Sequence, residues 1–421
     1  MGPVAHGGHC VARHEGRVLF VRHALPGERV VARVTEDGSG SYCRADAVRV
    51  LSASPDRVAP PCPHAGPGRC GGCDWQHATG AAQRAGKAAV VREQLARVAG
   101  LPAVPVTVEA LPAAGSAATS PAAAPARGGG SPAGAGPVEE GLLGWRTRVR
   151  FAVDADGRTG LRRHRSHELE PVRHCPLGTD AVAAAGVGDR RWPGAAEVEV
   201  VASTAGDTTV LADGSVLEGP GRVREVAAGR EWRVSATGFW QVHPAAADAL
   251  SGCALGLLEP RPGETALDLY AGAGLFAGLL ADAVGPAGRV VAVEADPTAA
   301  ADAEHNLAGA AAGVRVRPSR VTPGLLGGLG FRPDVVVLDP PRAGAGRDVI
   351  AALVELAPRA VAYVACDPAS FARDLRVALD AGWELRALRA FDCFPMTHHV
   401  EIVALLSERG SQRERAWCPG S

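Results

Sequence analysis

Cys366 and Glu401 are the two side chains whose settings best suit covalent chemistry. Cys366 ends an apolar stretch and precedes an expected helix, and a helix N-terminus lowers the pKa of a thiol and favours the nucleophilic thiolate. Glu401 stands at the entrance to the last apolar stretch, where it could accept a proton. Taken singly, each residue could instead be structural, Cys366 as a buried thiol and Glu401 as a strand-edge charge paired with an arginine.

A thiolate together with a base has a particular use on a pyrimidine ring. Carbon-5 of the ring is a poor nucleophile until a thiolate adds to carbon-6, and a base must remove the carbon-5 proton after a methyl group has been transferred. Cys366 and Glu401 could supply these two groups. We interpret the neighbouring His398 and His399 as hydrogen-bonded turn residues rather than catalysts.

Residues 268–276 (DLYAGAGLF) are typical of a loop that joins a strand to a helix around a ligand. Gly272 and Gly274 allow the backbone to approach a ligand at the helix N-terminus. Glu294 lies 22 residues beyond Gly272, where an acidic side chain accepts hydrogen bonds from ribose hydroxyls. The alternative is a tight turn beside a surface acid.

The identity of the ligand depends on a second motif. A dinucleotide is still compatible with this loop. Ala277 occupies the position of the third glycine in the dinucleotide-binding motif, and the looser form of that motif accepts an alanine there. Asp268 and the sequence Asp339-Pro-Pro-Arg342 favour S-adenosylmethionine, because methyltransferases of this topology place a polar group there, between cofactor and target base. Prolines hold the chain away from a helix at that point and direct carbonyl groups into the site.

Four cysteines could hold a metal centre. Cys62, Cys70 and Cys73 lie within one short segment, and Cys175 follows about a hundred residues later. Four thiolates can bind a [4Fe-4S] cluster or a tetrahedral zinc ion, and the spacing leaves both open. Unligated thiols are the third possibility.

Apolar strands alternate with alanine-rich helices between residues 236 and 407. We expect strands at 265–270, 290–294, 314–316, 335–339 and 360–365, with helices such as 297–310 and 368–381 between them. This alternation predicts a doubly wound, mainly parallel sheet that binds ligands at the carboxyl ends of its strands. Residues 383–391 and 399–406 should form an antiparallel hairpin.

The first half of the chain has a different organisation. Residues 1–55 contain short apolar stretches typical of a small β-barrel, and residues 56–235 form a central α+β region with a helix at 78–98. Within this region, residues 102–138 are rich in Ala, Gly, Pro and Ser, which predicts a disordered insertion. Residues 408–421 are expected to be a flexible tail.

Composition excludes several classes of protein. The 421 residues carry a net charge of −1, which argues against a uniformly basic protein, and of 44 basic residues only Lys87 is a lysine. Residues 145–175 nevertheless hold eight arginines against four acids, a stripe suited to RNA phosphates. No apolar run approaches the ~18 residues of a membrane span and no signal peptide is evident. We expect a cytoplasmic monomer without a membrane partner.

The motifs DLYAGAG, VLDPPR, VACDPASFARD and DCFPMTHHVE together resemble the RNA (uracil-5-)-methyltransferases. The resemblance implies an α/β Rossmann-like domain that uses S-adenosylmethionine to make 5-methyluridine. It implies that Cys366 is the nucleophile and Glu401 the general base. Cofactor contacts are implied for Gln241, Tyr270, Glu294 and Asp339, beside the glycines of the loop.

The same resemblance bears on the rest of the chain. Residues 1–55 resemble the OB-like TRAM module, and family members with this cysteine arrangement carry [4Fe-4S], which favours that cluster over zinc. The implied substrate is structured RNA, 23S ribosomal RNA in preference to transfer RNA. Two alternatives remain: a methyltransferase acting on an exocyclic amine through Asp339-Pro-Pro-Arg, and a non-enzymatic RNA-binding or iron-sensing protein.

Overall fold

The N-terminal strands form a small sheet. In a computed structural model, which describes residues 1–37, 40–113 and 139–410, four strands pair in the order β1-β2-β4-β3. They are β1 (Cys10–His14), β2 (Arg17–Arg22), β3 (Arg29–Glu36) and β4 (Tyr42–Ser52). Their apolar faces pack around Val21, Ala45 and the indole of Trp75, so the cysteine segment closes one side of this sheet.

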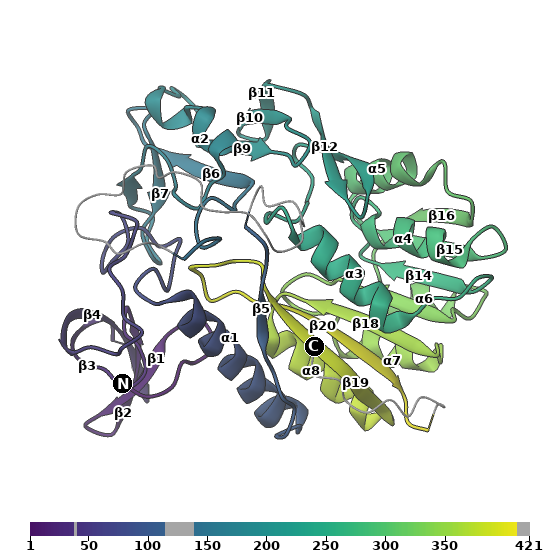
Figure 1. Cartoon of the computed structure of the whole chain (residues 1–421), viewed down its shortest axis with the longest axis horizontal. Coiled ribbons are helices and arrows are strands. Elements are labelled where there is room, and N and C mark those ends of the chain that lie inside the picture. Colours follow the sequence, from purple (N-terminus) through teal and green to yellow (C-terminus); the bar gives the residue numbers. More distant parts are fainter. Residues whose placement is uncertain (38–39, 114–138, 411–421) are drawn as a thin grey trace, which may run out of the picture.

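A second sheet lies above the N-terminal sheet in the view of Figure 1, next to the C-terminal half of the chain. Its order is β11-β10-β9-β6-β7-β8, and its core contains Val149, Phe151 and Trp192. The strands are β6 (Arg148–Val153), β7 (Thr159–Arg162), β8 (Leu169–Pro171), β9 (Glu197–Ala202), β10 (Thr208–Ala212) and β11 (Ser215–Glu218), accompanied by helix α2 (Asp180–Ala184). The hairpin β12 (Arg222–Ala227) and β13 (Arg230–Ser235) leads into the C-terminal half.

The C-terminal half is the predicted doubly wound α/β domain. Its sheet has the order β16-β15-β14-β17-β18-β20-β19-β5, where β5 (Val108–Ala110) comes from the first half of the chain. The first five of these strands run parallel, whereas β20 pairs antiparallel with both β18 and β19, as the expected hairpin requires. The strands are β14 (Thr265–Leu269), β15 (Arg289–Glu294), β16 (Gly313–Pro318), β17 (Val335–Leu338), β18 (Ala360–Ala365), β19 (Trp383–Asp392) and β20 (Glu401–Glu408).

Helices connect these strands and cover the sheet (Figure 1). They are α3 (Ala246–Leu258), α4 (Leu275–Val284), α5 (Pro297–Leu307), α6 (Pro323–Gly327), α7 (Arg347–Glu355) and α8 (Pro368–Asp380). Because order reverses at β14, which has β15 on one side and β17 on the other, the strand ends there open a crevice for a ligand.

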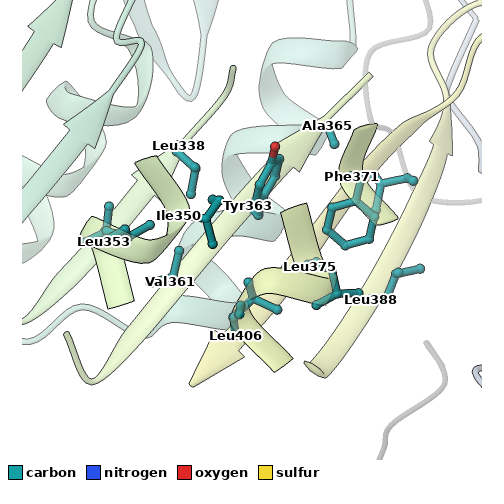
Figure 2. Packing of buried hydrophobic residues seen from close by; sticks show 14 of the residues in the cluster. Leu338, Ile350, Leu353, Val361, Tyr363, Ala365, Phe371, Leu375, Leu388 and Leu406 are labelled. Atoms are coloured by element: carbon teal, nitrogen blue, oxygen red, sulfur yellow. The ribbon is translucent and has the colours of Figure 1, made fainter. Parts of the chain in front are cut away.

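Cys366 lies between a buried strand and a well-capped helix. All six residues of β18 are buried, and Figure 2 shows Tyr363 of this strand beside Phe371 of α8. The Asp367 side chain caps α8 by accepting hydrogen bonds from the backbone of the next turn, and Pro368 occupies the first turn. This local structure fixes the backbone on both sides of Cys366.

The predicted insertion at residues 102–138 is wrong over its first part. Val106 and Val108 are buried, and β5 (Val108–Ala110) adds a parallel strand beside β19. Helix α1 (Gly80–Gln94) and its π-helical continuation (Leu95–Ala99) also pack on this domain, at Val91 and Leu95. These valines bury enough apolar surface to order the segment. Residues 114–138 lie outside the described residues.

The end of the chain differs slightly from the expected tail. Glu408 belongs to β20, and residues 411–421 lie outside the described residues. Among the residues that are described, no helix is long and apolar enough to cross a membrane.

Candidate functional site

A cavity of about 1080 Å³ opens at the carboxyl ends of the parallel strands. It brings together seven of the residues predicted for catalysis and cofactor binding: Gln241, Tyr270, Gly272, Glu294, Asp339, Cys366 and Glu401. Gly274 does not line this cavity. The predicted nucleophile, base and ribose-binding acid therefore face one space, although they come from separate strands.

The glycine loop is shaped by a carboxylate. The backbone N–H of Gly272 donates to Oε2 of Glu294 at 2.8 Å, and the N–H of Asp296 donates to Oε1 at 2.7 Å. Gly274 has φ +92°, and a Cβ there would lie 3.2 Å from Leu307. Gly274 thus starts α4 and allows close packing against α5, while Gly272 and Glu294 face the cavity.

Behind the loop, Asp268 is fully buried. Its Oδ2 accepts a hydrogen bond from the N–H of Ala277 at 2.8 Å, which ties β14 to the first turn of α4, while Oδ1 has no partner among the described residues. Burial raises the pKa of Asp268 well above its ordinary value. Asp268 therefore stabilises the loop through its hydrogen bond to Ala277 and does not line the cavity.

The thiol of Cys366, the predicted nucleophile, is less acidic than the sequence predicted. Burial, followed by the negative charges of Glu401 and Asp339, raises the pKa of Cys366 to about 12, and the opposing charge of Arg342 is smaller in effect. The prediction that a helix N-terminus lowers this pKa is therefore wrong for the protein alone. Desolvation and two nearby carboxyl groups outweigh the helix dipole, whose effect is typically about 1 kcal/mol.

The two carboxyl groups that face Cys366 are also perturbed. Burial raises the pKa of Asp339 to about 7. Burial and the charge of Asp339 raise the pKa of Glu401 well above its ordinary value, against the charge of Arg342. A carboxyl group with a raised pKa is a stronger base once ionised, so Glu401 is suited to proton removal.

Helix α1 holds the loop that precedes Glu401. Lys87 donates to Asp392 at 2.5 Å and to the carbonyl of Phe394 at 3.0 Å. Gln83 accepts a hydrogen bond from the N–H of Met396 at 2.7 Å. The position of the predicted base therefore depends on a helix that is about 310 residues distant in sequence.

The four predicted metal ligands line a second, smaller cavity of about 60 Å³. They are Cys62, Cys70, Cys73 and Cys175, and none of the cysteines in the described part of the chain forms a disulfide. Burial raises the thiol pKa of the first three. Within the described ranges, no three His, Cys, Asp or Glu side chains are grouped closely enough to hold a single metal ion.

In the arginine stripe of the central sheet, the side chains of Arg148 and Arg150 form hydrogen bonds within the protein. Arg148 donates to the carbonyl of Gly238 at 2.5 Å, and Arg150 donates to Glu199 at 2.9 Å. Arg146 lines both the large cavity and the cysteine cavity. Of the first three arginines in the stripe, Arg146 is thus the one that faces the site.

Phe239 and Arg342 are among the cavity residues to which the sequence reasoning gave no role. Phe239 is 66% exposed, an unusual position for a phenylalanine, and lines the cavity two residues before Gln241. Arg342 lowers the pKa of both Cys366 and Glu401. Arg342 belongs to a motif that the sequence reasoning used for its aspartate and prolines, whereas nothing in the sequence pattern marks Phe239.

The fold and the cavity define a class: a Rossmann-like methyltransferase with a nucleotide-type cofactor site and a cysteine beside it. Residues 328–409 match the family described as tRNA (uracil-5-)-methyltransferase, and residues 2–48 match the TRAM domain. The chain is 50% identical to an uncharacterized RNA methyltransferase of Streptomyces avermitilis over 96% of each chain. It is 30% identical to the 23S rRNA (uracil(1939)-C(5))-methyltransferase RlmD of Edwardsiella ictaluri over 94% of this chain and 92% of that protein.

The fold is also that of a solved relative. The Pyrococcus abyssi tRNA (uracil-54, C5)-methyltransferase, in complex with S-adenosyl-L-homocysteine, matches with a TM-score of 0.65 at 20% identity, over 92% of this chain and 94% of that one. The protein belongs to the family of S-adenosylmethionine-dependent RNA (uracil-5-)-methyltransferases. The family and fold predicted from the sequence motifs are thereby confirmed.

Proposed function

We propose that this enzyme transfers a methyl group from S-adenosylmethionine to carbon-5 of a uridine in structured RNA, with 23S ribosomal RNA preferred over transfer RNA. The observation that carries the proposal is the convergence of Cys366, Glu401 and Asp339 on the cavity that also contains the glycine loop. The preference for ribosomal RNA is supported by the relative whose name assigns it a uracil of 23S rRNA.

In the proposed cofactor site, Gly272 and Glu294 take the ribose end, and Gln241, Tyr270 and Asp339 lie along the same cavity. A cofactor with ribose hydroxyls suits this lining, because the carboxylates of the cavity can accept hydrogen bonds from those hydroxyls. S-adenosylmethionine, when bound, supplies a methyl group on a sulfonium, which is electrophilic enough to be attacked by carbon.

Cys366 performs the first covalent step in this proposal. Its sulfur adds to carbon-6 of the uracil, and the electron pair of the 5,6 double bond becomes available at carbon-5, which takes the methyl group. Glu401 then removes the carbon-5 proton. The double bond forms again and expels Cys366 as the thiolate, so the nucleophile is regenerated and one proton is released for each turnover.

The substrate has to expose its base to reach Cys366. Phe239 presents a largely exposed ring at the cavity, and aromatic side chains stack on bases that have been extruded from an RNA stack. We infer that Phe239 stacks on the target uridine or on a neighbouring base. A cytoplasmic enzyme is expected for such a substrate.

We infer that Cys62, Cys70, Cys73 and Cys175 hold a [4Fe-4S] cluster rather than zinc. The four cysteines line one small cavity. The preference for the cluster follows the resemblance of this cysteine arrangement to that of family members that carry [4Fe-4S]. Four cysteine thiolates suit the larger cluster. It would join two distant segments of the chain, and methyl transfer requires no electrons from it.

The test of the proposed function is a map of 5-methyluridine across total RNA from cells with and without the gene. We expect one position of 23S rRNA to lose its methyl group. Loss from transfer RNA alone would contradict the ribosomal preference, and methylation of an exocyclic amine instead would contradict the uracil chemistry. Iron and sulfide analysis of protein purified without oxygen tests the cluster, with Cys70→Ala as the variant that should lose it.

A further inference from the structure

The cysteine segment is joined directly to the loop that carries the proposed base. Oδ2 of Asp74 accepts a hydrogen bond from Nδ1 of His398 at 2.6 Å and another from the backbone N–H of His398 at 3.1 Å. The backbone N–H groups of Asp74 and Trp75 both donate to the carbonyl of Met396 at 3.0 Å. Four hydrogen bonds thus connect segments that are 324 positions apart at Asp74 and His398.

The Asp74 carboxylate is held on more than one side. Its side chain is 12% exposed and that of His398 is 28% exposed. Nη2 of Arg22, from strand β2, lies 3.4 Å from Oδ1 of Asp74 and 3.3 Å from the carbonyl of Cys73. The carboxylate therefore connects the N-terminal sheet, the segment that contains Cys73 and the loop that precedes Glu401. Hydrogen bonds to an ionised group are stronger and more directional than neutral ones.

From His398 the contacts continue into the reactive part of the cavity. The ring of His398 lies 4.1 Å from the ring of His399, measured between centroids. Nε2 of His399 lies 3.3 Å from Nη2 of Arg342, and Glu401 follows two residues later on β20. A shift of this turn would move Glu401, which precedes the first β20 residue paired with β18, Ile402. Cys366 instead lies between the end of β18 and the Asp367 cap of α8.

We propose that Asp74 is a positioning residue: through His398 it holds the turn before Glu401 in the geometry needed to remove the carbon-5 proton. The inference rests on the proposed function and deepens it, because it assigns a role in one step of the reaction. Addition of the Cys366 sulfur to carbon-6 of the uracil should not depend on Asp74. Release of the methylated product, which needs the base, should depend on it.

Two RNA substrates separate these steps. With 5-fluorouridine at the target position, fluorine replaces the proton that Glu401 removes, so the enzyme stops as a covalent adduct visible on a denaturing gel. Asp74→Ala should form this adduct at the wild-type rate and bind S-adenosylmethionine with the wild-type Kd. On ordinary RNA it should release product about 10- to 100-fold more slowly, so that the adduct accumulates.

Further variants test the pathway through His398. His398→Ala should slow release as Asp74→Ala does, and the double variant should be no slower than either single variant, because both changes break one connection. Asp74→Asn, which keeps one acceptor oxygen, should be intermediate. Asp380→Ala is the matched control, since this exposed aspartate pairs with Arg376 at the C-terminal end of α8, away from the cavity. Its release rate should equal that of the wild type.

The outcomes separate the two proposals. If the wild-type enzyme forms no adduct with 5-fluorouridine RNA, the proposed function fails. If the wild type forms it but Asp74→Ala and His398→Ala release product at the wild-type rate, the role of Asp74 is overturned. Equal slowing of adduct formation and release in both variants and in Asp74→Asn would also overturn it, because general disorder of the site would then explain the loss.

Discussion

Lys87 is the chain's single lysine, and its ammonium group is completely buried. It pairs with Asp392, whose side chain is 2% exposed, and donates a hydrogen bond to the carbonyl of Phe394. Burial lowers the pKa of Lys87, and the Asp392 carboxylate opposes that shift. Lys87→Met keeps most of the volume of the side chain and removes its charge, so the change isolates the buried ion pair.

The expected loss of stability follows from the group left behind. Oδ2 of Asp392 has no hydrogen-bond partner among the described residues, so removal of the ammonium leaves both carboxylate oxygens unsatisfied. Breaking a buried pair by removing one partner costs about 3–5 kcal/mol. We therefore expect the free energy of unfolding to fall by about that amount. Lys87→Met/Asp392→Leu should recover much of the loss, because no uncompensated charge remains.

Urea unfolding, followed by circular dichroism and tryptophan fluorescence, measures this difference. Arg97→Met is the matched control, because Arg97 forms an exposed i,i+4 pair with Glu93 on the helical continuation of α1. It should change stability by no more than about 0.5 kcal/mol. The reasoning is refuted if Lys87→Met stays within about 1 kcal/mol of the wild type, or if the double variant is less stable than Lys87→Met.

Three further predictions concern the cavity. Phe239→Ala should lower the affinity for substrate RNA by about 1–3 kcal/mol per stacked base, roughly 5- to 150-fold. Calorimetry should show unchanged binding of S-adenosylmethionine. An unchanged affinity for RNA would exclude a stacking role for Phe239. Because the charge of Glu401 raises the pKa of the Cys366 thiol, Glu401→Gln should move the pH profile of thiol alkylation to lower pH, and a shift to higher pH would contradict this electrostatic assignment. Burial raises the pKa of Asp339 to about 7, so between about pH 4 and 7 the folded protein keeps a proton that the unfolded chain has lost. Ionisation of Asp339 therefore lowers the free energy of unfolding as pH rises through that range. Asp339→Asn should make the free energy of unfolding depend less on pH, as measured by unfolding at several pH values. An unchanged pH dependence would count against the raised pKa.

Much of the catalytic domain could be predicted because its pattern is local. Alternating apolar strands and alanine-rich helices indicate a doubly wound sheet, and such a sheet places residues such as Gly272, Glu294 and Asp339 at the same edge. Strand β5 escaped prediction because three residues beside a low-complexity segment carry too little pattern. They become a strand only through pairing with β19.

The electrostatics of the site could not be read from sequence. The expected effect of a helix N-terminus on Cys366 is local, but the pKa of the thiol is set by burial and by the carboxyl groups of Glu401 and Asp339, which come from other parts of the chain. The buried pair of Lys87 and Asp392 joins residues that are 305 positions apart, and no local sequence pattern predicts this contact. Contacts of this kind depend on the tertiary fold, which brings α1 against the catalytic loop.

The most direct test of the account is whether Cys366 forms a covalent bond with a target uridine. RNA containing 5-fluorouridine, incubated with the enzyme and S-adenosylmethionine, should give a stable adduct, and mass spectrometry of the digested protein should place the nucleotide on the peptide that contains Cys366. Cys366→Ala should form no adduct and produce no 5-methyluridine. Normal methylation by Cys366→Ala, or an adduct on another residue, would contradict the account.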